Sequence, residues 1–233
     1  MRLDKLLASQ KCGSRSEVKE MIKKGQVSVN DEVVKSPDLK VDEKADRIEC
    51  NGCEIVYEEF VYYMLNKPAE VVTATKDNFD RTVIDLIDVP KKASLIPVGR
   101  LDKDTEGLLL LTDDGVLCHE LLSPKKHVDK TYYVRLKNPI TEADMDAFNI
   151  GINIGDDDLT NPAVCEILDN ANECNLTIRE GRFHQVKRMF HERDNEVLYL
   201  KRIRMGQLIL DDKLALGEYR ALTKTEIRSL HAN

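Results

Sequence analysis

The sequence lacks the features that would send a chain into a membrane or a secretory pathway. Its 233 residues contain no apolar run close to the roughly 20 residues that span a bilayer. The first residues, MRLDKLLASQKCGSRSE, have neither the apolar core nor the cleavage site of a signal peptide. We therefore expect a cytoplasmic protein that makes no contact with a membrane.

Nucleotide-cofactor motifs and metal-ligand clusters are also missing. The sequence has no P-loop and no glycine-rich dinucleotide fingerprint. Its six cysteines include one close pair, Cys50 and Cys53, without the second pair or Cys/His couple of a structural zinc site. In a chain without a secretory signal, these cysteines are expected to be free thiols. The sequence therefore predicts no metal site and no nucleotide cofactor.

Basic residues are in the minority, which at first argues against a nucleic-acid partner. The chain has 35 Lys and Arg against 42 Asp and Glu, a net charge of −7. Two segments depart from this balance: residues 1–30 hold seven basic and three acidic side chains, and residues 179–204 hold eight and four. One such segment is usually a solvated charged face. Two of them on an acidic chain favour an anionic ligand.

The first 57 residues predict a small ααβ unit. Leu3, Leu6 and Leu7 fall at helical spacing, and Ser14-Arg-Ser-Glu17 is a capping box that opens a second helix, which ends at Gly25. Residues 27–34 read as a hairpin around the turn pair Asn30-Asp31, and a further strand is expected around residues 47–49.

Three basic side chains of the second helix, Arg15, Lys19 and Lys23, are spaced four residues apart and share one helical face. This face suits the phosphates of an RNA backbone. The order LDKLLASQKCGSRSEVKEMIKKGQVSVND resembles the RNA-binding domain first described in the ribosomal protein S-four family. The resemblance predicts an S-four-type RNA-binding domain over residues 1–57.

Beyond residue 58 the pattern changes to short strands separated by turns, with helices between them. Strands are predicted around residues 60–68, 131–136, 174–178 and 207–210. Helices are predicted over residues 82–87, 115–122, 141–148 and 183–193. This mixture predicts an α+β domain over residues 58–233, built on a mainly antiparallel, mixed sheet.

The segment PVGRLDKDTEGLLLLTDDG at 97–115 is the most unusual in the chain. Gly99 and Gly107 permit a close approach of the backbone, and the four leucines that follow anchor one end of the loop in the core. A side chain such as Asp102 can then be held rigidly in a cleft. On these residues alone, the favoured reading is that Asp102, Asp104 and Asp113 cap turns.

Within that segment, GRLDKDTEGLLLLTDDG resembles the signature loop of the RsuA-type ribosomal small-subunit pseudouridine synthases. Three further segments agree with the motifs of that family in the same order: SPKKHVDKTYYV at 123–134, REGRFHQVKRMF at 179–190 and LKRIRMG at 200–206. With the N-terminal unit, these motifs cover essentially the full chain. The resemblance implies the pseudouridine synthase fold for residues 58–233.

The same resemblance implies roles for individual residues. Asp102 is the catalytic carboxylate, Tyr132 the aromatic ring that packs on the target base, and Lys187 the basic partner of the aspartate. Arg100 and Leu200 complete the substrate pocket. A second group is expected to bind RNA, consisting of Arg182 and Arg188 together with the basic face of the N-terminal unit.

Each role has a physical reason. Pseudouridine formation breaks the N1–C1′ bond, turns the uracil and joins C1′ to C5, so no cofactor is needed. An ionised Asp102 can act as a nucleophile or assist proton abstraction, and a lysine cation keeps it ionised. Stacking on Tyr132 returns part of the cost of extracting a base, because it is worth roughly 1 to 3 kcal/mol. For Tyr132 and Tyr133, simple alternation along a strand is the competing reading.

The histidines are weaker candidates. His184 and His191 are seven residues apart and have no paired carboxylate, so RNA contact or surface exposure explains them better than a metal site.

The expected substrate is one uridine of 16S rRNA, equivalent to position 516, in a partly assembled small subunit, and the expected oligomeric state is a monomer. Two alternatives stay open. One is a non-enzymatic RNA-binding protein of ribosome assembly, and the other is a synthase that acts on 23S rRNA.

Overall fold

The computed structural model describes residues 1–10, 12–89, 91–123, 126 and 128–231. It divides into two compact units, residues 1–61 with 88–93, and residues 62–87 with 94–233. The domain boundary predicted after residue 57 stays a prediction. Of the residues used in the sequence motifs, Lys11, Pro124, Lys125 and His127 lie outside the described part of the chain.

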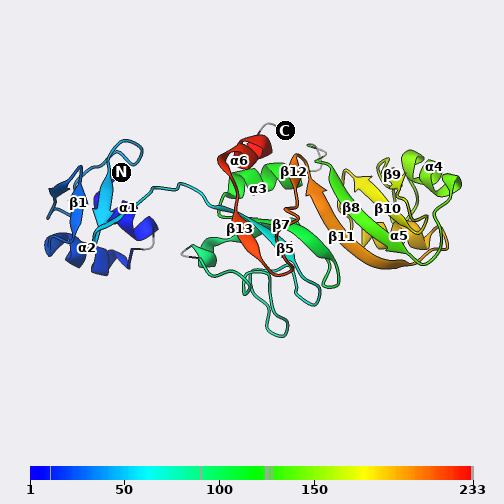
Figure 1. The fold of residues 1–233 in the computed structure, drawn as a ribbon, viewed down its shortest axis with the longest axis horizontal. Helices are drawn as coiled ribbons and strands as arrows, with labels where there is room; N and C mark the ends of the chain where they lie inside the picture. The colour runs from blue at the N-terminus through cyan, green and yellow to red at the C-terminus, as the bar shows by residue number, and fades with distance from the viewer. Residues whose placement is uncertain (11, 90, 124–125, 127, 232–233) are drawn as a thin grey trace. The chain divides into compact units, whose positions relative to one another are not determined.

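The N-terminal unit has two helices and a small antiparallel sheet (Figure 1). The Ser14 hydroxyl accepts a hydrogen bond from the Glu17 N–H, and the Glu17 carboxylate accepts one from the Ser14 N–H, which confirms the predicted capping box. The strands follow the order β2-β1-β3-β4. The elements are α1 (Leu3–Ser9), α2 (Arg15–Lys23), β1 (Val27–Val29), β2 (Glu32–Val33), β3 (Ile48–Cys50) and β4 (Cys53–Glu54).

The larger unit is built on a mixed sheet, nine-stranded in the described chain, whose main path runs β13-β5-β7-β11-β8-β10-β9. The pairing of β7 with β11 is parallel, and the other pairings described for this sheet are antiparallel. The predicted α+β class is confirmed. The strands are β5 (Tyr62–Lys67), β6 (Ile96–Val98), β7 (Glu106–Thr112), β8 (Lys130–Leu136), β9 (Val164–Ile167), β10 (Glu173–Ile178), β11 (Val197–Met205), β12 (Leu208–Ile209) and β13 (Tyr219–Ala221).

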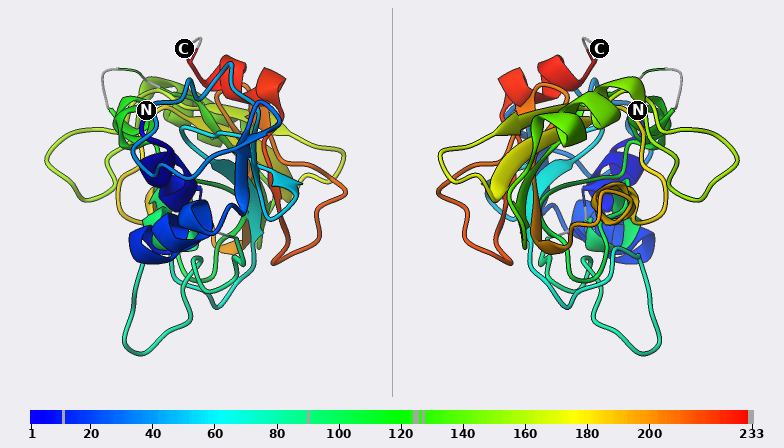
Figure 2. Two further views of the ribbon diagram at one scale, coloured as in Figure 1. Left: turned by 90° about the vertical axis from the view of Figure 1, so that its left-hand side faces the viewer. Right: turned by 90° about the vertical axis from the view of Figure 1, so that its right-hand side faces the viewer.

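The helices of this unit are α3 (Gly115–Leu122), α4 (Glu142–Ile150), α5 (Gln185–His191) and α6 (Lys224–His231), and a 3-10 turn, η1 (Lys92–Ser94), precedes β6. In Figures 1 and 2, α3 and α6 lie side by side against the sheet. Phe148 of α4 meets Phe190 of α5 edge to face, with 5.0 Å between the ring centroids. These helices pack on the sheet whose strands β6 and β7 flank the Asp102 loop.

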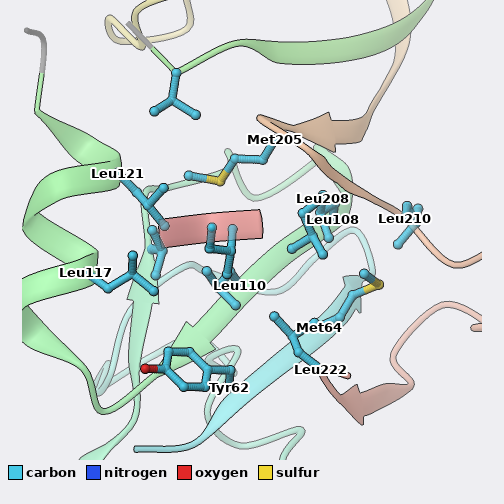
Figure 3. Packing of buried hydrophobic residues seen from close by; sticks show 13 residues of the cluster. Tyr62, Met64, Leu108, Leu110, Leu117, Leu121, Met205, Leu208, Leu210 and Leu222 are labelled. Carbon is cyan, nitrogen blue, oxygen red and sulfur yellow. The ribbon is translucent and has the colours of Figure 1, made fainter. Parts of the chain in front are cut away.

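The four leucines of β7 form the centre of this unit. Leu108 and Leu110 pack with Leu117 and Leu121 of α3, as Figure 3 shows. The two alternate leucines of β7 point to the opposite face of the strand and are also buried. A strand buried on both faces reads as an unbroken apolar run, which explains the LLLL segment. This strand fixes one end of the Asp102 loop.

Two helix predictions need correction. The segment predicted as a helix over residues 82–87 is a turn, because Thr82 bridges to Val72 and the following N–H groups bond three residues back. The Asp85 carboxylate accepts from the Thr82 N–H and closes the turn. The helix predicted from Phe183 begins at Gln185 instead, since His184 has a left-handed φ of 48°.

All six cysteines are free thiols. Over the described residues, no helix is long and apolar enough to cross a membrane.

Candidate active site

Asp102 lies on the loop between β6 and β7, and a buried lysine fixes the backbone of that loop. Lys67, at the end of β5, is fully buried. Its ammonium donates to the carbonyl oxygens of Pro68 (3.0 Å), Asp102 (3.1 Å), Lys103 (3.2 Å) and Thr105 (2.8 Å). Three N–H donors therefore serve four acceptors. Lys67 therefore holds the Asp102 loop against strand β5.

Two further contacts hold the same loop. The Thr73 hydroxyl donates to the Leu101 carbonyl at 2.7 Å and accepts from the Leu101 N–H at 3.1 Å. Gly107 has a φ of +102°, and a Cβ at this position would lie 2.3 Å from the Arg202 carbonyl oxygen. Only glycine fits where β7 approaches β11, which confirms the close backbone approach predicted for Gly107.

The Asp102 carboxylate meets a different side chain at each oxygen. Lys187 Nζ lies 3.3 Å from Asp102 Oδ2, and His184 Nε2 lies 3.5 Å from Asp102 Oδ1. Lys187 also binds Asp104, with 2.6 Å between Nζ and Oδ1. The Asp102 side chain is 27% exposed, so it is oriented without being sealed from solvent.

Burial and charge shift two pKa values around this carboxylate. Burial lowers the pKa of Lys67 to about 8, although the charges of Asp104 and Asp102 oppose the shift. Burial acts to raise the pKa of Asp104, but the hydrogen bond and the charge of Lys187 outweigh it and leave that pKa below its usual range. The loop therefore carries negative charge that is balanced by lysines on two sides.

Asp102 opens into a cavity of about 660 Å³. Four of the predicted residues line it: Arg100, Asp102, Tyr132 and Arg182. Lys187 contacts Asp102 from the side and lines a neighbouring depression of about 720 Å³. Leu200 is buried in β11 and is not among the described lining residues of the Asp102 cavity. The role of Leu200 in the pocket stays a prediction.

The two tyrosines of β8 point to opposite faces of the sheet. Tyr132 is 7% exposed and lines the Asp102 cavity. Tyr133 packs edge to face on Tyr199, with 5.9 Å between the ring centroids. The two tyrosines therefore alternate along the strand, and this alternation is what directs the Tyr132 ring into the cavity.

The two arginines predicted to bind RNA make intramolecular contacts. Arg182 donates to the Asp158 carbonyl at 2.8 Å and to the Glu180 carboxylate at 3.1 Å. Arg188 pairs with Asp156 and donates to the Phe183 carbonyl at 3.1 Å, which fixes the turn before α5. Their contact with RNA stays a prediction.

Arg15, Lys19 and Lys23 are all exposed on α2 of the N-terminal unit. Their spacing of four places them along one exposed stripe of the helix, as predicted, and this stripe runs beside the buried Val18 and Ile22 rather than opposite them.

Sequence reasoning missed two residues of the site. Lys67 ends an apolar strand in the segment NKP, and the sequence gives no sign of the four carbonyls it binds. His184 belongs to the REGRFHQVKRMF motif, which was a usable signal, although we assigned the histidine to RNA contact or the surface. The left-handed backbone that brings it to Asp102 depends on the folded turn.

Comparisons with known proteins match the whole chain. The family model described as RNA pseudouridylate synthase matches residues 61–192, and the S4 domain model matches residues 1–48. The chain is 47% identical to an uncharacterized RNA pseudouridine synthase, YtzG, of Bacillus subtilis, over 99% of this chain and 98% of that protein. It is 42% identical to the ribosomal small subunit pseudouridine synthase A of Haemophilus influenzae, over 99% of both chains.

The corresponding Escherichia coli protein is 41% identical, over 99% of this chain and 100% of that one. A crystal structure of a pseudouridylate synthase, 41% identical, superposes with a TM-score of 0.71 and covers 99% of both chains. Fold, sequence motifs and full-length relatives agree. The chain belongs to the RNA pseudouridylate synthase family and carries an N-terminal S4 domain.

Proposed function

We propose that this pseudouridine synthase isomerises one uridine of 16S rRNA, equivalent to position 516, with Asp102 as the catalytic carboxylate. The observation that carries the proposal is the Asp102 carboxylate itself, with Lys187 at one oxygen and His184 at the other, facing a cavity that also contains Tyr132. The 16S substrate is supported by the relatives named for the ribosomal small subunit.

In this proposal the target uridine leaves the RNA stack and enters the cavity. Extraction of a base costs a few kcal/mol, and stacking on Tyr132 returns part of that cost. Arg100 and Leu200 hold the nucleotide. Lys187 orients the Asp102 carboxylate, so that it is ready to act at the sugar or the base.

The N-terminal unit supplies a second grip on the RNA. Arg15, Lys19 and Lys23 contact backbone phosphates, and Arg182 and Arg188 add contacts near the cavity. Two grips on one RNA favour a folded target, so the proposed substrate is a partly assembled small subunit, which a monomer modifies in the cytoplasm.

The proposal is tested with Asp102→Asn, which keeps the size of the side chain and removes its charge. Pseudouridine formation on rRNA should fall to the background rate, while the unfolding temperature and the RNA affinity stay close to those of the parent. Asp104→Asn is the matched control, because Asp104 binds the same lysine without being among the described lining residues of the cavity. It should slow the reaction without abolishing it. Turnover by a folded Asp102→Asn protein at the parental rate would sink the proposal.

A further inference from the structure

Three side chains from two neighbouring strands share one face of the sheet inside the Asp102 cavity. Arg202 of β11 is the direct register partner of Tyr132 of β8. Lys130 precedes Tyr132 by two residues and so points to the same face of β8. All three line the cavity. The ring of Tyr132 is therefore flanked by two cationic side chains.

Arg202 is almost completely buried, and one of its terminal nitrogens is unpaired among the described residues. Its side chain is 1% exposed, and its Nε donates to the Leu108 carbonyl at 2.8 Å. Its Nη2 is buried and has no hydrogen-bond partner in the described chain. Leaving an ionised donor buried and unpaired costs more than the single backbone bond returns. A buried donor of this kind requires an explanation, and its position in the wall of the Asp102 cavity is consistent with an acceptor supplied by a ligand.

Lys130, like Arg202, has one hydrogen bond to a backbone carbonyl. Its ammonium donates to the Val128 carbonyl at 3.0 Å, and within the described residues neither Lys130 nor Arg202 forms an ion pair. Burial lowers the pKa of Lys130, and the charge of Arg202 lowers it further. The charges of Asp129 and Glu180 oppose this lowering. Two cationic side chains on one wall of the cavity favour a ligand with negative charge beside them.

We propose that Lys130 and Arg202 bind the carbonyl oxygens of uracil while the ring is detached from the ribose, and stabilise its negative charge. This inference rests on the proposed pseudouridine synthase reaction at Asp102. When the N1–C1′ bond breaks, its electron pair stays on the uracil and spreads over N1, O2 and O4. C1′ becomes electron-deficient and faces the Asp102 carboxylate. Cations already in place stabilise charge that develops only during the reaction.

The remaining steps balance without a co-reactant. After the ring turns, C5 donates the electron pair to C1′ and forms the new bond. C5 then loses its proton, and N1 gains one. The product has the same atoms and the same charge as the substrate. Lys130 and Arg202 hold the ring through the turn, because they lie on either side of the Tyr132 ring on which it stacks.

Depth in the cavity favours the uracil over a backbone phosphate as the ligand. A base that stacks on Tyr132 carries its oxygens to the residues beside that ring. Phosphates stay with the backbone at the opening, where Arg179 is 57% exposed and paired with Asp129. Arg202 is 1% exposed, so it lies deeper in the cavity than Arg179.

The test compares Lys130→Gln and Arg202→Met with Arg204→Met, in which an exposed arginine of the same strand, not among the described lining residues of the cavity, is changed. Single-turnover pseudouridine formation on the rRNA that the parent protein modifies should be about 100-fold slower in each of the first two variants. The dissociation constant for that RNA should stay within about twofold of the parental value. Arg204→Met should react at the parental rate.

RNA that contains 5-fluorouridine separates charge stabilisation from a purely structural effect. Fluorine withdraws electrons and stabilises the detached uracil anion, so bond cleavage should depend less on the two cations. The rate deficit of Lys130→Gln, measured as loss of 5-fluorouridine, should shrink from about 100-fold to about 10-fold. A deficit that is equal on both RNAs would overturn the inference.

Two further outcomes distinguish failure of this inference from failure of the proposed function. Weaker RNA binding with an unchanged single-turnover rate would assign the cations to phosphates and overturn the inference. Absence of any pseudouridine with the parent protein would instead overturn the proposed function. If Arg202→Met fails to fold, Lys130→Gln and Arg202→Lys decide, since Arg202→Lys should recover part of the lost rate.

Discussion

Among single residues, Asp102 depends on side chains that reach it from separate parts of the chain. Lys187 and His184 come from the segment around α5 and meet its two oxygens. Lys67 comes from β5 and binds the carbonyl of Asp102 itself. The carboxylate therefore keeps its place because both its backbone and its side chain are held.

Replacing Lys67 with Met should loosen the backbone of the Asp102 loop. Four carbonyls would lose their shared donor, although those of Asp102 and Lys103 keep a bond from the Thr105 and Glu70 N–H groups. Each buried acceptor left unsatisfied costs about 1 to 3 kcal/mol. After partial relaxation, we expect the unfolding free energy to fall by about 2 to 4 kcal/mol and pseudouridine formation to drop at least tenfold. Urea denaturation and a rate assay measure both. Lys76→Met, which changes an exposed lysine beyond β5, should leave both values unchanged. A stable and fully active Lys67→Met protein would contradict the role given to this lysine.

For whole elements, the sequence was most informative where local chemistry decides the structure. The capping box at Ser14 and the buried leucine run of β7 were predicted correctly, because each is determined by residues that are neighbours in the sequence. The helix predicted over residues 82–87 was wrong, because a bridge to Val72 competes with it. The roles of Lys67 and of the left-handed His184 could not be predicted, because their contacts join segments that are distant in the chain.

The C-terminal helix offers a test of stability at the same scale. Glu226 of α6 accepts hydrogen bonds from both terminal nitrogens of Arg220, in β13, and from the Thr223 N–H. The hydrogen bond from Arg220 lowers the pKa of Glu226 to about 2, against an ordinary value of 4.5. The folded state thus favours the ionised form. This stability is present above about pH 4.5 and is lost as the pH falls through about 2.

Glu226→Gln should therefore lower the unfolding free energy at pH 7 by about 1 to 3 kcal/mol. The difference from the parent should shrink as the pH falls toward 2. Urea denaturation at a series of pH values measures it. Glu142→Gln, in the exposed first turn of α4, is the control for loss of one negative charge. A difference that stays constant from pH 7 to pH 2 would show that the Arg220 pair is not its source.

On the scale of the whole molecule, the chain combines an S4 domain with a catalytic unit although its net charge is −7. The basic face of α2, formed by Arg15, Lys19 and Lys23, concentrates positive charge on the S4 domain. Each phosphate contact contributes about 0.7 to 0.9 to the slope of log K against log salt. The acidic total is thus compatible with an RNA substrate, because in the proposed function this local positive charge contacts the phosphates.

Changing Arg15, Lys19 and Lys23 together to Gln should reduce the salt slope of RNA binding by about 2 to 3. All three side chains are exposed, so the S4 domain should keep its fold. Titrations of labelled rRNA at several salt concentrations measure the slope. Three Gln substitutions at the exposed Lys35, Lys40 and Lys44 remove the same charge elsewhere in this unit and should change the slope less. Equal salt slopes for the two triple variants would contradict the proposal that the basic residues of α2 bind the RNA phosphates.

The central claim is that the whole molecule modifies one uridine of 16S rRNA through Asp102. The most direct measurement maps every pseudouridine in the rRNA of a strain that lacks the protein and of its parent. One 16S modification should be missing. Purified parent protein should restore it on 16S rRNA with a subset of small-subunit proteins bound, and Asp102→Asn should not. A modification lost from 23S rRNA or tRNA, with the 16S pattern intact, would contradict the proposed substrate, and an unchanged map in every RNA would contradict the claim entirely.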